Sequence, residues 1–265
     1  MELRRLVRGQ VEWSRLERVG REIARRYDRE GVRVEFLEAE NWLSTPCVVD
    51  REWFVKVISP QNALVHALFT GARNAGVFSR GEEGFFERYD GPVEMASHEL
   101  EATERLRSIG VNVPQPIESF AVGDLGVLVL EYLPDFRTFD ELGAGEVGRL
   151  APELFDLLST MHENGLAHGD LRDENVLVCD GELYVIDVTN VRSDGMRAAR
   201  AYDVACALSV LSPVLGSKRA VTLALERYTV EDVLAAREFV DLVNLRPDHD
   251  FDAARVKGEI EKRAS

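Results

Sequence analysis

The stretch HGDLRDENVLV, residues 168–178, decides how the rest of the chain is interpreted. An amphipathic run over residues 154–166 precedes it, and an apolar segment over residues 183–186, directly before Asp187, follows it. Helical periodicity before the stretch and short apolar runs after it predict a loop between a helix and a β-hairpin. The apolar residues 176–178 mark the end of that loop and the first strand of the hairpin.

Three polar side chains in and after this loop carry its chemistry. Asp170 lies in the loop, Asn175 follows five residues later, and Asp187 comes just past the next strand. Each residue alone would most often be a turn residue or a helix cap. As an ordered set they suit phosphoryl transfer. In that reaction one carboxylate accepts the proton of the acceptor hydroxyl, while an amide and a second carboxylate hold magnesium against the phosphates.

The order of these residues resembles the catalytic loop of the protein-kinase-like superfamily, whose usual form is His-Arg-Asp-Leu-x-x-x-x-Asn. The resemblance implies an α+β, two-lobed fold with a small β-rich N-lobe and a helical C-lobe. It also implies an organisation into three parts. These are an N-terminal helical extension over residues 1–31, an N-lobe over residues 32–130 with an insertion at 59–95, and a C-lobe over residues 131–265.

Composition limits the partners that this chain is expected to have. With 265 residues and 45% hydrophobic residues, it is long enough for one large domain or two lobes. A net charge of −15 disfavours broad binding to nucleic-acid backbones. Three scattered cysteines, the lack of a signal peptide and the lack of an apolar run of membrane-spanning length predict a cytoplasmic protein with no membrane partner.

Periodicity predicts the elements at the start of the chain. Apolar residues at helical spacing predict a helix over residues 11–29, and packing against the small lobe is its expected role. Alternating and apolar runs predict strands over residues 32–37, 48–50 and 53–58.

The segment between the first two strands, residues 38–46, contains no glycine. The phosphate-covering loop of protein kinases, which would lie here, is rich in glycine so that backbone amides can approach the phosphates. Asn41, Ser44 and Thr45 could offer side-chain donors in compensation, and Trp42 could cover the adenine or simply fill the lobe.

Lys56 lies inside the apolar strand Phe54-Val55-Lys56-Val57-Ile58. This strand resembles the Val-Ala-Ile-Lys strand of kinases, whose lysine pairs with the α- and β-phosphates of ATP. The alternative is a lysine that points to water, because period-2 alternation would send it away from a core that holds Val55 and Val57. The chain has only four lysines, and a surface position in this arginine-rich sequence would be expected to hold arginine. We therefore prefer the phosphate role.

A helix predicted over residues 94–109 should supply a glutamate that pairs with Lys56. Glu99, Glu101 and Glu104 compete for this role, and each could instead belong to a solvated helix face. The helix runs into Gly-Val-Asn-Val-Pro-Gln-Pro at residues 110–116, which resembles a segment of RIO-type kinases. Alignment on that segment favours Glu99.

The apolar run over residues 126–134 resembles the strand and hinge that contact adenine in kinases. The resemblance implies that Glu131 and Leu133 bind the base through main-chain groups. An ordinary sheet strand that ends at a proline is the alternative. Upstream, the insertion is expected to contain a helix over residues 61–72 and a glycine-rich loop over residues 76–91.

Three features resemble atypical RIO-type serine/threonine kinases. They are the His-Gly-Asp loop, the segment at residues 110–116, and the short distance from Asp187 to the next helix, which leaves no room for an activation segment. The large insertion after Lys56 and the compact C-terminal lobe also favour that type. The sequence is also similar to the small kinase of the tRNA-threonylcarbamoyl complex and to aminoglycoside and choline phosphotransferases. Asp203 resembles the buried aspartate that holds the catalytic loop, with a helix N-cap as the alternative.

The resemblance implies a role for each residue of the loop. Asp170 would orient or deprotonate the acceptor hydroxyl, and His168 would brace the loop. Asn175 and Asp187 would hold magnesium. Arg172 would meet the γ-phosphate, with a solvated surface arginine as the alternative.

These roles predict a phosphotransferase that uses ATP and Mg²⁺, most plainly a RIO-like protein kinase or ATPase. The acceptor would be a hydroxyl group of a protein or of a small molecule. One alternative is a small-molecule phosphotransferase of the aminoglycoside or choline type. A second is a pseudokinase scaffold that binds a nucleotide without turnover, which the glycine-free loop favours and the intact polar set does not.

Overall fold

The computed structural model describes residues 11–37, 43–78, 86, 89–188, 195–245 and 250–264. The chain forms two compact units. Unit 1 comprises Met1–Ala72, Arg88–Glu104 and Pro114–Pro134, and unit 2 comprises Arg73–Glu87, Arg105–Val113 and Asp135–Ser265. Two helices, α3 (Pro60–Phe78) and α4 (Pro92–Ser108), contribute residues to both units.

Unit 1 is built on a five-stranded antiparallel sheet with the strand order β1-β2-β3-β5-β4. Its strands are β1 (Val34–Phe36), β2 (Thr45–Val49), β3 (Trp53–Ile58), β4 (Pro116–Val122) and β5 (Leu125–Glu131). The strands predicted near the start of the chain are confirmed, although β2 begins earlier than expected. Asn41, a candidate side-chain donor to the phosphates, and Trp42, a candidate to cover the adenine or fill the lobe, lie outside the described residues.

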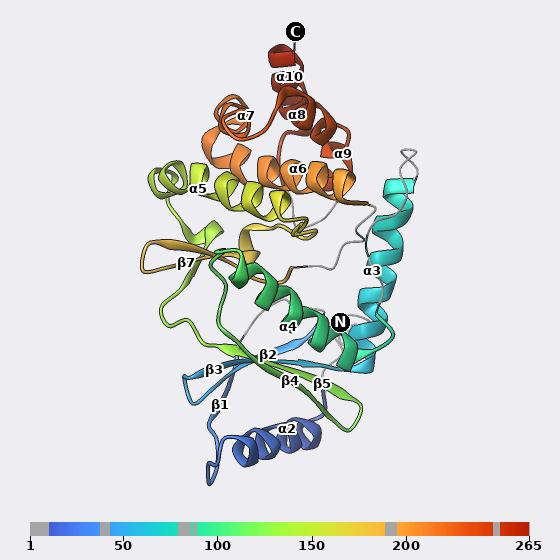
Figure 1. Cartoon of the computed structure of the whole chain (residues 1–265), viewed down its shortest axis with the longest axis vertical. Coiled ribbons are helices and arrows are strands. Elements are labelled where there is room, and N and C mark those ends of the chain that lie inside the picture. Colours follow the sequence, from blue (N-terminus) through green and yellow to red (C-terminus); the bar gives the residue numbers. More distant parts are fainter. Residues whose placement is uncertain are drawn as a thin grey trace. The chain divides into compact units, whose positions relative to one another are not determined.

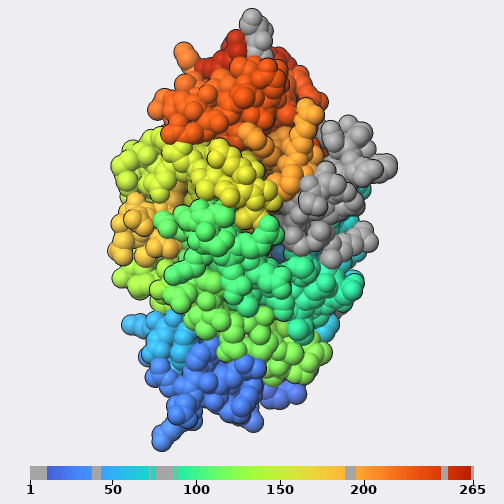
Figure 2. Space-filling view, viewed as in Figure 1, coloured from blue at the N-terminus to red at the C-terminus, as the bar shows by residue number. Residues whose placement is uncertain are grey.

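Helices cover both faces of this sheet (Figure 1). Helix α2 (Trp13–Arg26), which confirms the helix predicted over residues 11–29, packs Val19 and Ile23 on the face that carries Val55 and Val57. Its other side forms an exposed surface, coloured blue in Figure 2. Helix α4 packs against the opposite face.

Lys56 lies on the sheet face covered by α4 and is only 4% exposed. Alternation along β3 places the side chain of Lys56 on the other face of the sheet from Val55 and Val57. The face that carries Lys56 is not exposed to solvent, however, because Met95 and Ala96 of α4 cover it. The alternative of a solvent-facing lysine is therefore wrong.

Gly126 of β5 lies directly against the first turn of α4. A Cβ atom added at Gly126 would overlap the carbonyl group of Pro92 and lie 2.9 Å from the backbone nitrogen of Val93. Because these neighbours are backbone, Gly126→Ala must displace α4 from the sheet, and we expect the free energy of unfolding to fall by about 1–3 kcal/mol. Urea unfolding measures this change.

Gly145→Ala is the matched control, since Gly145 lies within a helix and a Cβ there meets no heavy atom within 4 Å. The control should leave stability unchanged or raise it by up to about 1 kcal/mol. Equal stabilities for the Gly126→Ala protein and the wild type would show that α4 and β5 are not in close contact.

Unit 2 is mainly helical. Helix α6 (Met196–Leu215) lies between α5 (Ala144–Glu163) and the C-terminal helices, as Figure 1 shows. The C-terminal helices are α7 (Ser217–Leu225), α8 (Val230–Arg237), α9 (Val240–Asn244) and α10 (Ala253–Ala264). A three-stranded antiparallel sheet completes the unit, with the strands β6 (Arg137–Thr138), β7 (Val176–Cys179) and β8 (Glu182–Val185).

Helix α6 is the central core helix of unit 2. Against our expectation that no apolar run reaches membrane-spanning length, its 20 residues and hydropathy of 1.3 meet that criterion by length and composition. However, 72% of that window is buried inside the protein. This is the pattern of a core helix packed on all sides.

The predicted order of helix, loop and hairpin around residues 168–178 is confirmed. Helix α5 leads into the loop, a short 3₁₀ turn (Asp173–Asn175) ends it, and β7 and β8 form the hairpin. The helix expected over residues 61–72 extends further, to Phe78, so the glycine-rich loop does not begin at residue 76. Residues 79–85 and 87–88 lie outside the described residues. The predicted α+β fold, with a β-rich N-lobe and a helical C-lobe, is confirmed.

Candidate active site

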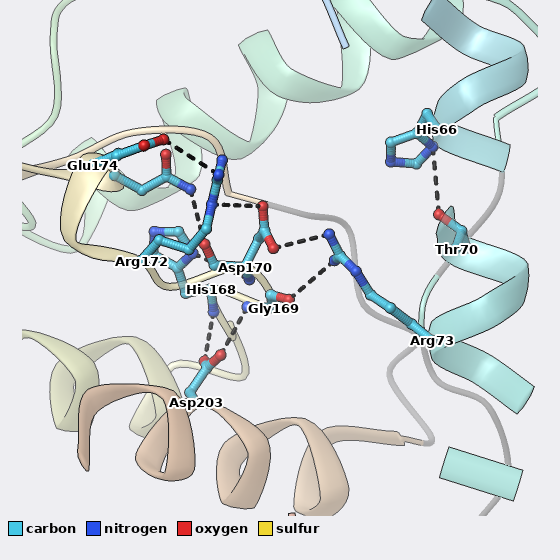
Figure 3. Close-up of polar contacts among 10 residues, drawn as sticks. His66, Thr70, Arg73, His168, Gly169, Asp170, Arg172, Glu174 and Asp203 are labelled. Atoms are coloured by element: carbon cyan, nitrogen blue, oxygen red, sulfur yellow. Dashed lines mark hydrogen bonds and ion pairs between the residues drawn. The ribbon is translucent and has the colours of Figure 1, made fainter. Parts of the chain in front are cut away.

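Asp203 holds the start of the catalytic loop (Figure 3). The residue is completely buried within α6. Its two carboxylate oxygens accept hydrogen bonds from the backbone N–H of His168, at 2.6 Å, and of Gly169, at 2.8 Å. The alternative of a helix N-cap is wrong, because α6 begins seven residues earlier, at Met196. Asp203 therefore fixes the loop backbone directly before Asp170.

His162 completes the environment of this carboxylate. Its Nε2 lies 3.0 Å from Oδ2 of Asp203, and its Nδ1 lies 2.9 Å from the hydroxyl of Tyr228. All three side chains are buried. The catalytic loop is thus tied through one aspartate to helices α5 and α6 and to the segment that precedes α8.

His168 is buried in the loop and braces it. Its Nδ1 accepts a hydrogen bond from the backbone N–H of Asp170 at 3.3 Å, so in the neutral ring the proton resides on Nε2. Nε2 has no hydrogen-bond partner among the described residues. Burial lowers the pKa of His168, because the surrounding protein disfavours the charged ring.

This lowered pKa predicts how stability depends on pH. An unfolded histidine has a pKa near 6.5, so below that pH the unfolded state binds a proton that the folded state does not. The free energy of unfolding should therefore decrease between about pH 7.5 and 5.5, with a limiting slope of about 1.4 kcal/mol per pH unit from His168. Urea unfolding at several pH values measures the slope. His168→Asn should show a shallower slope. An unchanged slope would mean that His168 does not cause the pH dependence of stability.

Asp170 lies between two arginines (Figure 3). Nη2 of Arg73 donates to Oδ1 of Asp170 at 2.8 Å, and Nη1 of Arg73 donates to the backbone oxygen of Gly169 at 3.3 Å. Nε of Arg172 lies 3.6 Å from Oδ2. The side chain of Asp170 is 6% exposed. Both of its oxygens therefore face a guanidinium group.

Arg172 is not the solvated arginine of the alternative. Its side chain is 22% exposed, and besides approaching Asp170 it donates from Nη1 to Glu174 at 3.3 Å. The guanidinium of Arg172 is held beside the carboxylate of Asp170. A role on the γ-phosphate stays a prediction.

Asn175 and Asp187 supply the candidate magnesium ligands. Asn175 is buried, and its Nδ2 donates to the backbone oxygen of Asp170 at 2.8 Å, which leaves Oδ1 as its acceptor for a metal. The backbone N–H of Ile186 donates to the backbone oxygen of Asn175 at 3.1 Å, and Asp187 directly follows that pair. Asp187 has a φ of +60°, a conformation that aspartate tolerates better than most residues.

This donor set fits magnesium. The two side chains offer amide and carboxylate oxygens, and magnesium in phosphate-binding sites commonly takes one or two protein carboxylates together with phosphate oxygens. Within the described ranges, no group of three His, Cys, Asp or Glu side chains gathers to form an all-protein metal site. The assignment of Asn175 and Asp187 as metal ligands stays a prediction.

Unit 1 contains the predicted lysine–glutamate pair. Nζ of Lys56 forms a hydrogen-bonded ion pair with Oε1 of Glu99, and their side chains are 5% and 19% exposed. The competing Glu101 and Glu104 are exposed. Of the three glutamates, Glu99 is thus the one that meets the lysine. The binding of phosphates by this pair stays a prediction.

Glu131 ends β5, and Leu133 follows it two residues later. The N–H of Glu131 donates to Gln115 at 2.9 Å and that of Tyr132 donates to Glu52 at 3.0 Å, both to backbone oxygens. These two amides are already used within unit 1, so the next amide that could meet a base is that of Leu133. The binding of adenine by main-chain groups of Glu131 and Leu133 stays a prediction.

Arg73 is the site residue that sequence reasoning missed. It precedes Asp170 by 97 residues and lies in α3, within the insertion. No motif marks it, because an arginine in an arginine-rich chain carries no signal of its own. Only the folded chain brings it to the catalytic loop.

Comparison with solved structures finds protein kinase domains. The PknI kinase domain of Mycobacterium tuberculosis aligns over 89% of this chain and 96% of that chain. The identity is 15% and the TM-score is 0.43, a level that does not by itself establish a fold.

Comparison with known sequences agrees with the geometry of the site. A family model, the RIO domain, matches residues 88–202. The KEOPS complex subunit Bud32 of Pyrococcus abyssi is 27% identical over 114 residues, which are 42% of this chain and 51% of that protein. The RIO-type serine/threonine-protein kinase Rio1 of Haloferax volcanii is 37% identical over 95 residues, which are 32% of this chain and 29% of that protein.

The chain therefore spans about half or less of the length of these relatives. The matched region contains Glu99, the whole catalytic loop and Asp187, whereas Lys56, Arg73 and Asp203 lie outside it. The match to the RIO domain and the two relatives, taken with the order of the motifs, support an atypical RIO-type, protein-kinase-like protein.

Proposed function

We propose that this chain is an ATP- and magnesium-dependent phosphotransferase that acts as a RIO-like serine/threonine kinase or ATPase. The observation that carries the proposal is the buried anchoring of Asp170. Asp203 fixes the backbone before it, and Asn175 donates to its carbonyl oxygen. A candidate base held in this way is positioned before the substrate arrives, and such positioning is one of the two main sources of rate enhancement in phosphoryl transfer.

Each unit would have a separate task in the proposed reaction. Asp170 would accept the hydrogen bond of the acceptor hydroxyl, or of water in the ATPase reaction, and take up its proton as the new bond to phosphorus forms. Lys56, oriented by Glu99, would bind the phosphates of ATP. Asn175 and Asp187 would hold magnesium, which when bound neutralises charge on the phosphates.

We also propose that the protein acts in a reducing compartment such as the cytoplasm. Cys47, Cys179 and Cys206 are buried thiols. Burial raises the pKa of Cys47 to about 12, so its thiol stays protonated and unreactive at neutral pH.

The test is transfer from γ-labelled ATP with and without magnesium, at low and at high salt. Label on serine or threonine of the protein itself or of an added protein supports a kinase, and released phosphate alone supports an ATPase. Label on an added small hydroxyl compound, with none on protein, would move the assignment to the small-molecule phosphotransferases. ATP bound without any turnover would contradict the proposal and leave a nucleotide-binding scaffold.

A further inference from the structure

The contact between Arg73 and Asp170 joins the insertion to the candidate catalytic base. The guanidinium of Arg73 forks between two acceptors of the loop, Oδ1 of Asp170 at 2.8 Å and the backbone oxygen of Gly169 at 3.3 Å. The side chains of Arg73 and Asp170 are 20% and 6% exposed, so the pair is weakly screened by water. A charge-assisted bond in such surroundings is stronger than a surface ion pair.

The ion pair with Arg73 interferes with the proposed role of Asp170 as the base. A carboxylate that receives a hydroxyl proton needs an electron pair within hydrogen-bond reach of that hydroxyl. Here Arg73 occupies one oxygen, while Arg172 approaches the other at 3.6 Å. Two guanidinium groups thus face the carboxylate, one at each oxygen (Figure 3). An acceptor hydroxyl that needs Oδ1 must displace Arg73.

A second set of contacts holds Arg73 in this position. Its guanidinium carbon lies 5.1 Å from the ring centre of Phe86, within the range of a cation–π contact. The side chain of Asn74 makes two hydrogen bonds to the backbone of Phe86. Its Nδ2 donates to the carbonyl oxygen at 2.9 Å, and its Oδ1 accepts from the N–H at 3.0 Å. The Phe86 ring packs edge-on against Tyr202, with the ring centres 5.5 Å apart.

Tyr202 directly precedes Asp203, which fixes the catalytic loop. The anchor of Arg73 and the anchor of Asp170 are therefore adjacent residues of one helix, α6. This shared support holds the guanidinium and the carboxylate at contact distance. We call the group Arg73, Asn74 and Phe86 the insertion latch.

We propose that the insertion latch is an autoinhibitory device, in which Arg73 occupies the acceptor side of Asp170 until it is displaced. The inference rests on the proposed phosphotransferase function. In the latched state Asp170 is paired and the acceptor is excluded. In the open state the carboxylate receives the hydroxyl. A ligand that binds the open state more tightly than the latched state would activate the protein. The size of the activation is limited by the ratio of the two affinities.

Two variants open the latch in different ways. Arg73→Ala removes the guanidinium, and Asn74→Ala removes the two hydrogen bonds that hold Phe86 while leaving Arg73 in place. Both should raise magnesium-dependent turnover of γ-labelled ATP, and the rise in Arg73→Ala should be the larger; a latch that is open about one-tenth of the time would give about a tenfold rise. Arg227→Ala is the control, because it removes an exposed ion pair to Asp156 in the same unit. It should leave turnover as in the wild type.

The outcomes separate the latch from the function on which it rests. Higher turnover in Arg73→Ala and Asn74→Ala than in the wild type and in Arg227→Ala supports the latch. Turnover in the wild type that equals or exceeds that of Arg73→Ala overturns the latch and leaves the phosphotransferase intact. No turnover in any variant, with ATP bound and each protein folded by circular dichroism, overturns both.

Discussion

Replacement of Asp170 by asparagine is expected to lower the rate of phosphoryl transfer by about 10²–10⁴-fold, the usual contribution of a positioned general base. Asparagine keeps the shape of the side chain and can still accept a hydrogen bond from Arg73. It cannot take up the hydroxyl proton, because its amide oxygen is a very weak base. The measurement is transfer from γ-labelled ATP at saturating ATP.

The fold should survive this substitution. Asp203 holds the loop through the backbone of His168 and Gly169, and the amide of Asn175 bonds to the carbonyl of residue 170, so none of these contacts uses the replaced carboxylate. We expect the thermal midpoint and the affinity for ATP to stay close to those of the wild type. If Asp170→Asn retained half of the wild-type rate, Asp170 would not be the base.

Combining this change with an open latch gives a further check. Arg73→Ala should not restore transfer to an Asp170→Asn protein, because opening the latch only frees a carboxylate that this protein lacks. A double variant as active as the wild type would mean that Asp170 is not the base.

The sequence predicted the parts of the site that are encoded locally. The loop at residues 168–178 is short, and its polar residues lie within a few positions of a helix and a hairpin that periodicity identifies. The resemblance of residues 110–116 to RIO-type kinases favoured Glu99 over Glu101 and Glu104 but could not decide among them. The fold decides it, because of these three only Glu99 meets Lys56.

Other features depend on packing that no local pattern contains. The burial of Lys56 requires α4 to cover the second face of the sheet, which alternation along one strand cannot reveal. The last turns of α3 contain Gly71 and Gly76, which have low helix propensity. In the fold, the bonds of Asn74 to Phe86 support these turns. The contact of Arg73 with Asp170 arises from the same long-range packing.

Asp203→Ala is expected to be the most destabilising single change in the described part of unit 2. The carboxylate accepts from two backbone amides and faces a ring nitrogen of His162, all without exposure to water. Removal leaves these groups buried without an acceptor, and each such group costs about 1–3 kcal/mol. We expect the free energy of unfolding to fall by about 3–5 kcal/mol, a large share of the stability of an ordinary domain. Urea unfolding measures it.

Asp156→Ala provides the matched control, since it removes an aspartate that pairs with Arg227 and is 48% exposed. Its effect should stay within about 1 kcal/mol. Asp203→Asn removes the charge of the side chain but keeps its size. Its amide oxygen can still accept one hydrogen bond, but its NH₂ group faces a backbone N–H, so two donors meet. Asp203→Asn should therefore be less stable than the wild type and more stable than Asp203→Ala. Equal stability of Asp203→Asn and the wild type would show that the charge of this carboxylate does not hold the catalytic loop.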